Sequence, residues 1–441
     1  MEHETSYLRS FLRYASLNVM GMIALSCYIL ADTFFVSQGM GVNGLTALNL
    51  AIPVYNFIHG SGLMIGMGGG TKYSIQQSQR QTGAANQAFT GALSLAALFA
   101  AVFVLVGLFG SGFLATLLGA DAQVHPMTKT YLQVILLFSP AFLLNNVLLC
   151  FVRNDGAPQL SMAAMITGSL SNVVLDWVFI FPCGLGIFGA AFATGLAPII
   201  SMSVLSIHFL RKRNRFRPVR GRLTRLLLAG ILATGLPSLV TEVSSGVVII
   251  VFNALMLQLS GNVGVAAYGV IANLSLVVIA IYTGIAQGIQ PLVSRAFGAG
   301  NRKQARATLR YALTTMLFLS GVLYAILFLG ATPIAGIFNS EDNATLQQLA
   351  SQGIRLYFLA CPFAGFNIIL SLYLTSMDRP RPAQIISLLR GFLVILPLAV
   401  CLARLAGILG IWCAFPGAEL LVACAGLILF QRTERESAAG R

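Results

Sequence analysis

Four acidic residues stand inside long apolar stretches of this sequence, where an ionised side chain is costly. They are Asp32, Asp176, Glu242 and Glu419. A charge at the centre of a lipid bilayer costs roughly 2.5–3.5 kcal/mol on insertion scales, so ionisable residues in such places usually serve a function. A carboxyl group held away from water is suited to bind a dehydrated cation or to hold a proton. The sequence therefore indicates cation or proton chemistry inside its apolar segments.

The neighbours of these acids suggest how each one is used. Asn172 precedes Asp176 by one helical turn, so the amide and the carboxylate share a helix face and can act on one cation. Arg390 and Glu419 lie in adjoining apolar segments, and an unpaired arginine there would be very costly. We predict a structural salt bridge between them, with substrate recognition by Arg390 as the alternative. Glu242 either lines a cavity or pairs with a polar neighbour.

Composition identifies the elements that must position these residues. Of the 441 residues, 57% are hydrophobic and 9% charged, and the mean hydropathy is +0.83. A soluble chain carries about 25% charged residues, so this sequence has too few charges to cover a surface that faces water. The apolar residues come in blocks of roughly 20, the length of a membrane-spanning helix. We predict an all-α polytopic membrane protein with twelve transmembrane helices, near 14–36, 45–68, 88–110, 131–151, 160–181, 187–210, 226–257, 265–289, 309–337, 357–374, 383–402 and 408–430.

The net charge is +14, and the distribution of the basic residues indicates membrane topology rather than a nucleic-acid site. Lys and Arg gather in the even-numbered loops and the tails, including Arg153 and the run at 211–224, and are rare in the odd loops. This is the positive-inside pattern, so we expect both termini in the cytoplasm and the basic linker near anionic membrane lipids. The expected divisions are a cytoplasmic N-terminus (1–13), an N-lobe (14–210), the linker (211–224), a C-lobe (225–431) and a cytoplasmic tail (432–441).

The two halves of the chain resemble each other. Gly44-Leu45-Thr46-Ala47 opens the second block, and Gly264-Val265-Ala266-Ala267 opens the eighth. The polar loop 153–159 is echoed by 378–384 in the same order. Because both halves run in the same orientation, this is a parallel repeat about an axis along the membrane normal. It predicts two pseudo-symmetric six-helix lobes with a cavity between them, as in secondary transporters.

Several motifs resemble the multidrug and toxic compound extrusion (MATE) family over nearly the whole chain. The resemblance is carried by Ala31-Asp32-Thr33-Phe34-Phe35, by Asn172-Val173-Val174-Leu175-Asp176, and by Gly189-Ala190-Ala191-Phe192-Ala193-Thr194. Near the C-terminus, Arg390, Pro397, Gly410-Ile411-Trp412 and Pro416 with Glu419 resemble the MepA-like branch. The resemblance implies a bacterial inner-membrane transporter that exports organic cations or other amphiphilic, drug-like molecules in exchange for H⁺ or Na⁺.

The same resemblance implies which residues hold the coupling cation. Family members cluster an acid of the first helix with the Asn and Asp of the fifth and a Thr of the sixth. The matching positions here are Asp32, Asn172, Asp176 and Thr194. Glu242 is a candidate second acidic site, but it stands at a different offset from Gly-Leu-Pro than the helix-seven glutamate of the NorM-like branch.

Aromatic and methionine residues in the apolar blocks are candidates for a polyspecific cavity. Aromatic faces attract organic cations, and methionine adapts to varied shapes. Packing between helices is the alternative role for each. The candidates are Tyr28, Phe35, Tyr55, Met64, Phe252, Met256, Tyr268 and Tyr282.

Other functions fit the sequence less well. A flippase for lipid-linked oligosaccharides should show several inward basic residues, whereas Arg390 is the one basic residue that the sequence places deep in a helix. No metal-ligand or Ser/His constellation lies on an apolar block, and His59 and His208 look isolated, so neither an enzyme nor a metal or other cofactor is expected. A passive channel suits a two-lobe repeat with buried acids poorly. No Walker A motif is present, which excludes direct use of ATP. We expect a monomer.

Overall fold

The computed structural model describes residues 2–221, 223–339 and 343–439. These residues form helices and loops, with no strand among them. The long helices are α1 (Glu2–Ser78), α2 (Thr82–Phe109), α6 (Pro158–Ile180), α7 (Gly186–Leu210), α8 (Arg225–Gly298), α9 (Arg302–Leu329) and α14 (Ile395–Ala439). The shorter ones are α3 (Ser111–Leu117), α4 (His125–Leu137), α5 (Ser139–Asn154), α10 (Ala331–Ile337), α11 (Ala344–Tyr357), η1 (Phe358–Ala360), α12 (Cys361–Ser376), α13 (Pro380–Leu388) and η2 (Leu389–Leu393).

Three of the long helices are sharp hairpins that turn at a glycine. Gly41, Gly261 and Gly407 have φ values of 63°, 60° and 59°, a region that a residue without a Cβ enters at little cost. The chain then runs back beside itself, since Tyr28 and Tyr55 on the two sides of Gly41 join their hydroxyl oxygens at 2.7 Å. The loops predicted between the first and second, seventh and eighth, and eleventh and twelfth spans are therefore single-residue turns.

Counting these hairpins reconciles the structure with the predicted number of spans. Eight helical stretches of the described residues are long and apolar enough to cross a membrane, and the pair α4–α5, bent by 47°, makes a ninth. Three of the eight contain a glycine hairpin and supply two spans each. The described part of the chain therefore has twelve spans, and the predicted all-α fold is confirmed.

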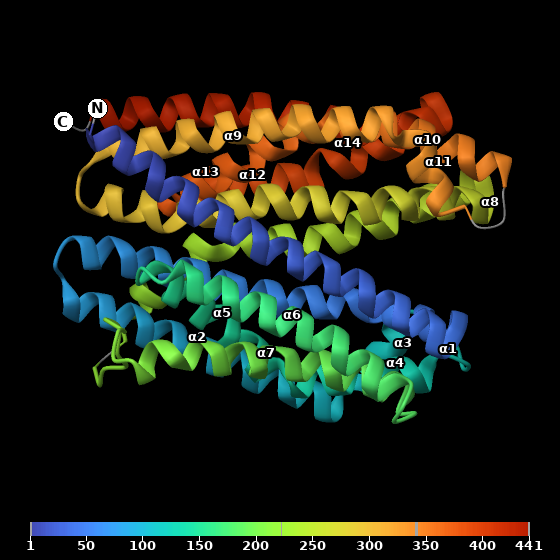
Figure 1. Cartoon of the computed structure of the whole chain (residues 1–441), viewed down its shortest axis with the longest axis horizontal. Coiled ribbons are helices and arrows are strands. Elements are labelled where there is room, and N and C mark those ends of the chain that lie inside the picture. Colours follow the sequence, from blue (N-terminus) through green and yellow to red (C-terminus); the bar gives the residue numbers. More distant parts are fainter. Residues whose placement is uncertain (1, 222, 340–342, 440–441) are drawn as a thin grey trace.

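The spans form two lobes that lie side by side (Figure 1). The N-lobe holds α1 to α7 and the C-lobe holds α8 to α14, and each lobe has its own large apolar core. Near its start, each half of the chain contributes a residue to the core of the other lobe. Phe11 of α1 packs in the C-lobe core, and Ile231 of α8 packs in the N-lobe core. These two residues are the same distance apart in sequence as Gly41 and Gly261, which supports the predicted pseudo-symmetry.

One detail of the predicted repeat was wrong. The helices on either side of the fourth–fifth loop end at Asn154 and begin at Pro158, and their counterparts end at Ser376 and begin at Pro380. The loop at 153–159 therefore corresponds to 375–381 rather than to 378–384. The sequence comparison matched Gln159 with Gln384, whereas the fold follows the proline that opens each next helix, Pro158 and Pro380.

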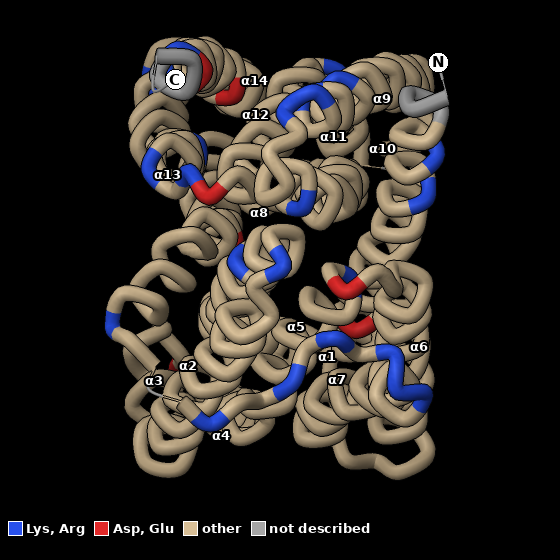
Figure 2. Tube along the Cα trace, turned by 90° about the vertical axis from the view of Figure 1, so that its left-hand side faces the viewer, with Lys and Arg blue, Asp and Glu red and all other residues tan. Residues whose placement is uncertain are grey.

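Surface character divides the molecule into an apolar belt and a basic end. Large apolar side chains are exposed along α2 (Leu98, Val102, Leu105) and α9 (Leu317, Phe318), as helices facing lipid require. Both termini and the linker lie at one end of the bundle, where many Lys and Arg residues gather (Figure 2). We call this the basic end.

Candidate functional site

The four residues expected to hold a cation come together in the N-lobe. Asp32 lies on α1, Asn172 and Asp176 on α6, and Thr194 on α7, and all four are buried. With its nitrogen turned toward Asp176, the Asn172 amide donates to Asp176 Oδ2 at 3.0 Å and accepts from the Thr194 backbone N–H at 3.2 Å. The helical spacing of Asn172 and Asp176 thus produces the shared face that the sequence predicts.

The two carboxyl groups of this cluster are buried close to each other. Two negative charges so close together and away from water are unfavourable, which favours a proton or a cation between them. Asp32 Oδ1 and Asp176 Oδ1 are buried and have no hydrogen-bond partner in the described part of the chain. Unpaired buried acceptors are costly, so the cluster is suited to a proton or a small cation that would satisfy them.

A cavity lies beside this cluster. Its wall includes Tyr28 and Tyr55 of α1, Phe142 of α5 and Thr194 of α7. The Tyr55 ring stacks on His59 with centroids 5.9 Å apart and meets the Phe142 ring edge-on. Thr194 therefore belongs to both the cluster and the cavity wall. Tyr28 stands one helical turn from Asp32 on α1, which gives a second direct connection between the two.

Glu242 lies in the wall of the same cavity, between the lobes. It approaches α1 closely, because a Cβ added at Gly60 would stand 2.9 Å from the Cβ of Glu242. Of the two roles left open for this residue, its position matches the cavity-lining one. The cavity wall thus contains an acidic group of the C-lobe, and the acid cluster of the N-lobe adjoins the same cavity.

The aromatic and methionine candidates divide into three groups. Tyr28 and Tyr55 line the cavity. Phe35 packs against Phe181 with centroids 6.1 Å apart, and Met64 is buried where its backbone meets Gly235 of α8. The remaining four are packed inside the C-lobe core instead of lining the cavity: Phe252, Met256, Tyr268 and Tyr282.

Arg390 and Glu419 meet inside the C-lobe as expected. Arg390 Nε lies 2.6 Å from Glu419 Oε1. The second oxygen, Glu419 Oε2, accepts from Asn367 Nδ2 at 2.7 Å. The pair is away from the cavity wall described above, and both carboxylate oxygens are occupied by protein donors.

Sequence reasoning missed several polar residues of the cavity. His59, which looked isolated, lies 3.2 Å from the Asn146 amide through its Nδ1. Arg153 was assigned to a basic loop, but the structure buries its side chain in the last turn of α5, where it also lines the cavity. Its local sequence, Arg-Asn-Asp-Gly-Ala-Pro, is typical of a surface loop and gave no indication of burial. Its partners Asn18 and Gln287 are far away in sequence, so local spacing held no signal.

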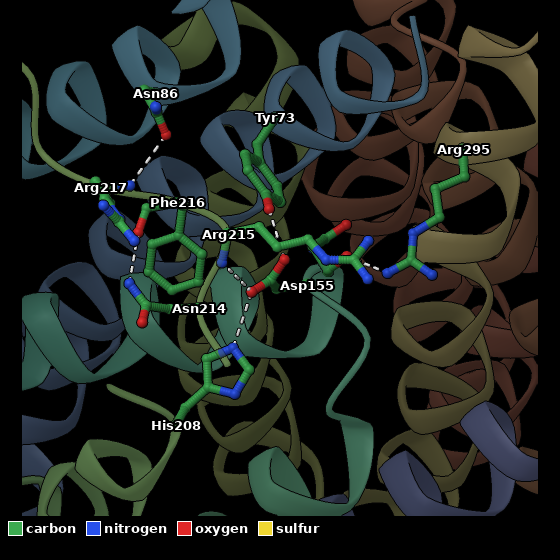
Figure 3. A network of polar contacts seen from close by, with 10 residues as sticks. Tyr73, Asn86, Asp155, His208, Asn214, Arg215, Phe216, Arg217 and Arg295 are labelled. Carbon is green, nitrogen blue, oxygen red and sulfur yellow. Dashed lines mark hydrogen bonds and ion pairs between the residues drawn. The ribbon is translucent and has the colours of Figure 1, made fainter. Parts of the chain in front are cut away.

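The linker is docked on the N-lobe at the basic end (Figure 3). Asp155 accepts hydrogen bonds from the Tyr73 hydroxyl at 2.7 Å, from His208 Nε2 at 2.8 Å and from the Arg215 backbone N–H at 2.8 Å. The Phe216 side chain is buried against the ring of Phe89, with centroids 4.6 Å apart. His208, which also looked isolated in the sequence, is thus part of the anchor. The linker backbone is held by protein, while most of its arginine side chains remain exposed.

Polar contacts join the two lobes at the basic end. Lys72 Nζ of α1 lies 2.5 Å from Asp378 Oδ2, in the loop between α12 and α13. Asn154 Nδ2 of α5 donates to Gln290 Oε1 of α8 at 2.8 Å. Arg295 of α8 also donates to the Asn154 carbonyl oxygen. The cavity is therefore closed off at this end by bonds that must break if the lobes separate there.

Comparison with known proteins places the chain in a family. The family model described as MatE matches residues 19–178 and 237–401, well over half of the chain. The chain belongs to this family, the multidrug and toxic compound extrusion transporters. Within it, the chain is MepA-like, as predicted: the multidrug export protein MepA of Staphylococcus saprophyticus is 25% identical over 433 residues, covering 97% of this chain and 94% of that protein.

Solved structures share the fold closely. A crystal structure of MATE in complex with MaL6 has a TM-score of 0.91 at 22% identity and covers 98% of this chain and 97% of its own. An outward-facing conformation of a multidrug resistance MATE family transporter also has a TM-score of 0.91 at 22% identity, covering 98% and 96%. At this identity the likeness shows the two-lobe fold.

Proposed function

We propose that this protein exports amphiphilic organic cations and related drug-like molecules from the cytoplasm by antiport with H⁺ or Na⁺. The observation that carries the proposal is the buried acid pair, Asp32 and Asp176, which has unpartnered oxygens and belongs to a cluster that shares Thr194 with the cavity wall. The printed function of the MepA relatives, multidrug export, supports the same conclusion. The coupling cation occupies the cluster and the drug occupies the cavity, which has acidic and aromatic groups in its wall.

The mechanism needs only that ion and drug prefer different states of the carrier by a few kcal/mol. In the outward-facing state, a cation from outside enters the cluster and neutralises Asp32 and Asp176. The first part of α1 then shifts, and it carries Tyr28 with it because Tyr28 is one turn from Asp32. This movement expels the drug from the cavity. Asn172 and Thr194 are further ligands of the coupling ion while it is bound. The carrier then returns inward and releases the ion into the cytoplasm, where the activity of that ion is lower.

The orientation follows from the basic end. We infer that both termini and the linker face the cytoplasm, with the lobes at 14–210 and 225–431, because Lys and Arg accumulate on the cytoplasmic side of bacterial membranes. The bonds that join the lobes at the basic end then correspond to an outward-facing state. A lipid-linked oligosaccharide flippase remains the second candidate. Among the basic residues described, Arg153 is the one in the cavity wall, whereas a pyrophosphate group would require several.

Labelling of single cysteines tests the orientation. In a variant without the seven native cysteines, Gln38→Cys and Gln123→Cys should react with a membrane-impermeant maleimide in intact cells. Arg213→Cys should react only after the membrane is opened. All three side chains are exposed, so access depends on the side of the membrane. Labelling of Arg213→Cys in intact cells would contradict the proposed topology.

Transport in proteoliposomes tests the function itself. Purified protein is reconstituted with a fluorescent cation, and an H⁺ gradient and a Na⁺ gradient are imposed separately. We expect one of the two to drive accumulation well above that of protein-free liposomes, because the acid cluster must exchange the coupling ion. Dissipating that gradient with an ionophore should abolish the difference. Uptake that responds to neither gradient would rule out cation-coupled export.

A further inference from the structure

Arg153 is a buried cation in the cavity wall that neither ion coupling nor the C-lobe salt bridge uses. Its side chain is 2% exposed, and it lines the same cavity as Tyr55 and Glu242. A buried guanidinium normally pairs with a carboxylate, because an uncompensated charge away from water is costly. Among the ion pairs of residues 2–221, 223–339 and 343–439, none includes Arg153.

The partners of this guanidinium are neutral. Nη1 donates to Asn18 Oδ1 at 2.7 Å and to Gln287 Oε1 at 3.0 Å. Nη2 contacts two sulfur atoms, Met67 Sδ at 3.3 Å and Cys150 Sγ at 3.6 Å, and sulfur is a weak acceptor. Nε has no partner. The ionisable groups close enough to act on its charge are the Cys150 thiol and the Tyr14 hydroxyl, and neither is a carboxyl group.

One of these partners is lost when the lobes separate. Gln287 belongs to α8 of the C-lobe, whereas Arg153 belongs to α5 of the N-lobe. Opening the basic end therefore pulls Gln287 Oε1 away from Nη1 and leaves the guanidinium with less compensation than before. An anionic group that enters from that side would replace Gln287 and the sulfur contacts with charge-assisted hydrogen bonds, which a guanidinium forms most strongly with carboxylates and phosphates.

We propose that Arg153 is an anion-binding subsite of the cavity, the residue that makes a carboxylate on a cationic amphiphile strengthen its binding. The inference rests on the proposed export function and assigns a specificity-determining residue to it. Glu242 supplies the opposite pole. It lies against Gly60 of α1, and Arg153 contacts Met67 of the same helix, seven residues further on. Seven residues of α-helix span about 10 Å, so the cavity fits a zwitterion whose charges are about that far apart.

Tyr55 and His59 lie on α1 just before Gly60, at the Glu242 pole, where their stacked rings can cover the cationic end of such a molecule. A purely cationic amphiphile would be attracted to Glu242 but repelled by Arg153. A zwitterion is attracted at both ends. The cavity should therefore bind a molecule with an ionised carboxylate more tightly than the same molecule with that carboxylate esterified.

Rhodamine B and its methyl ester form such a pair, because the free dye is a zwitterion and the ester a cation with the same fluorophore. We measure their binding to the purified full-length protein in nanodiscs by fluorescence polarisation. The wild type should bind rhodamine B at least about tenfold more tightly than the ester. Arg153→Gln should remove this preference, because rhodamine B loses its charge-assisted hydrogen bonds and the ester loses the repulsion. Arg153→Lys should retain part of it, because the charge remains but the planar fork is lost.

Arg213→Gln, which neutralises an exposed arginine of the linker, is the matched control and should keep the wild-type preference. Equal affinities of the wild type for the two dyes would overturn the proposal, and this comparison decides it even if Arg153→Gln does not fold. If a folded Arg153→Gln variant bound neither dye, the proposal would be overturned too. That result would show that Arg153 serves as a structural contact between the lobes. Gradient-driven export of the ester separates the two proposals: its absence removes the export function, whereas export without a carboxylate preference removes only this subsite.

Discussion

Asp32→Asn and Asp176→Asn are each expected to reach the membrane folded and to lose gradient-driven export, down to the level of protein-free liposomes. Asparagine keeps the size of the side chain and can donate a hydrogen bond to the remaining carboxylate. It cannot exchange a proton or balance the charge of a bound cation, so ion occupancy no longer differs between the states of the carrier. Without that difference in free energy, the gradient cannot drive export.

The measurement is transport of a fluorescent cation in proteoliposomes, with melting temperature and size-exclusion profile as tests of folding. Asn172→Ala and Thr194→Ala should weaken coupling less severely, because each removes a neutral ligand and leaves both acids. Asp121→Asn is a matched control, since Asp121 is exposed in the loop before α4. If both Asp→Asn variants exported drug at normal rates, the N-lobe cluster would be the wrong site and Glu242 would become the leading coupling residue.

Hydropathy and charge were sufficient to predict the architecture of this protein. Blocks of about 20 apolar residues specify spans because lipid offers no other partners for backbone polar groups, and this constraint is local. The repeat was visible for the same reason: Gly41 and Gly261 each turn a hairpin, and the sequence around them is similar in the two halves. The constraints that produced these features act within a few tens of residues.

The cavity depends on contacts that act over much longer separations. Arg153 reaches Asn18 and Gln287, which are 135 and 134 residues away in sequence. Its own segment reads as a polar loop, and nothing local indicates that its side chain turns inward. Phe252 and Tyr268 show the converse case. Their residue types suit a drug cavity, but α8 folds back at Gly261 and stacks the two rings on each other inside the C-lobe, 5.3 Å apart.

The salt bridge between Arg390 and Glu419 should have the largest effect on stability. Removing one member of a buried pair leaves an uncompensated charge and typically costs about 3–5 kcal/mol. The loss should be near the upper end in Arg390→Met, because Glu419 is 2% exposed and would keep only its hydrogen bonds from Asn367. Glu419→Gln should cost less, because the Gln oxygen can still accept from one of the two donors and the Arg390 side chain is 16% exposed, so water can reach the remaining charge.

The double variant Arg390→Met/Glu419→Gln separates the pair energy from the cost of each change. Replacing both charges removes the uncompensated ion, so we expect it to recover part of the stability lost in Arg390→Met, with an interaction energy of about 0.5–3 kcal/mol. Expression level and melting temperature in a mild detergent are the measurements. Arg390 lies in the π-helical segment η2 and is not among the residues of the cavity wall, so drug affinity should not change in variants that fold. Normal stability together with lost drug binding in Arg390→Met would instead assign Arg390 to substrate recognition, because a structural pair cannot be broken without loss of stability.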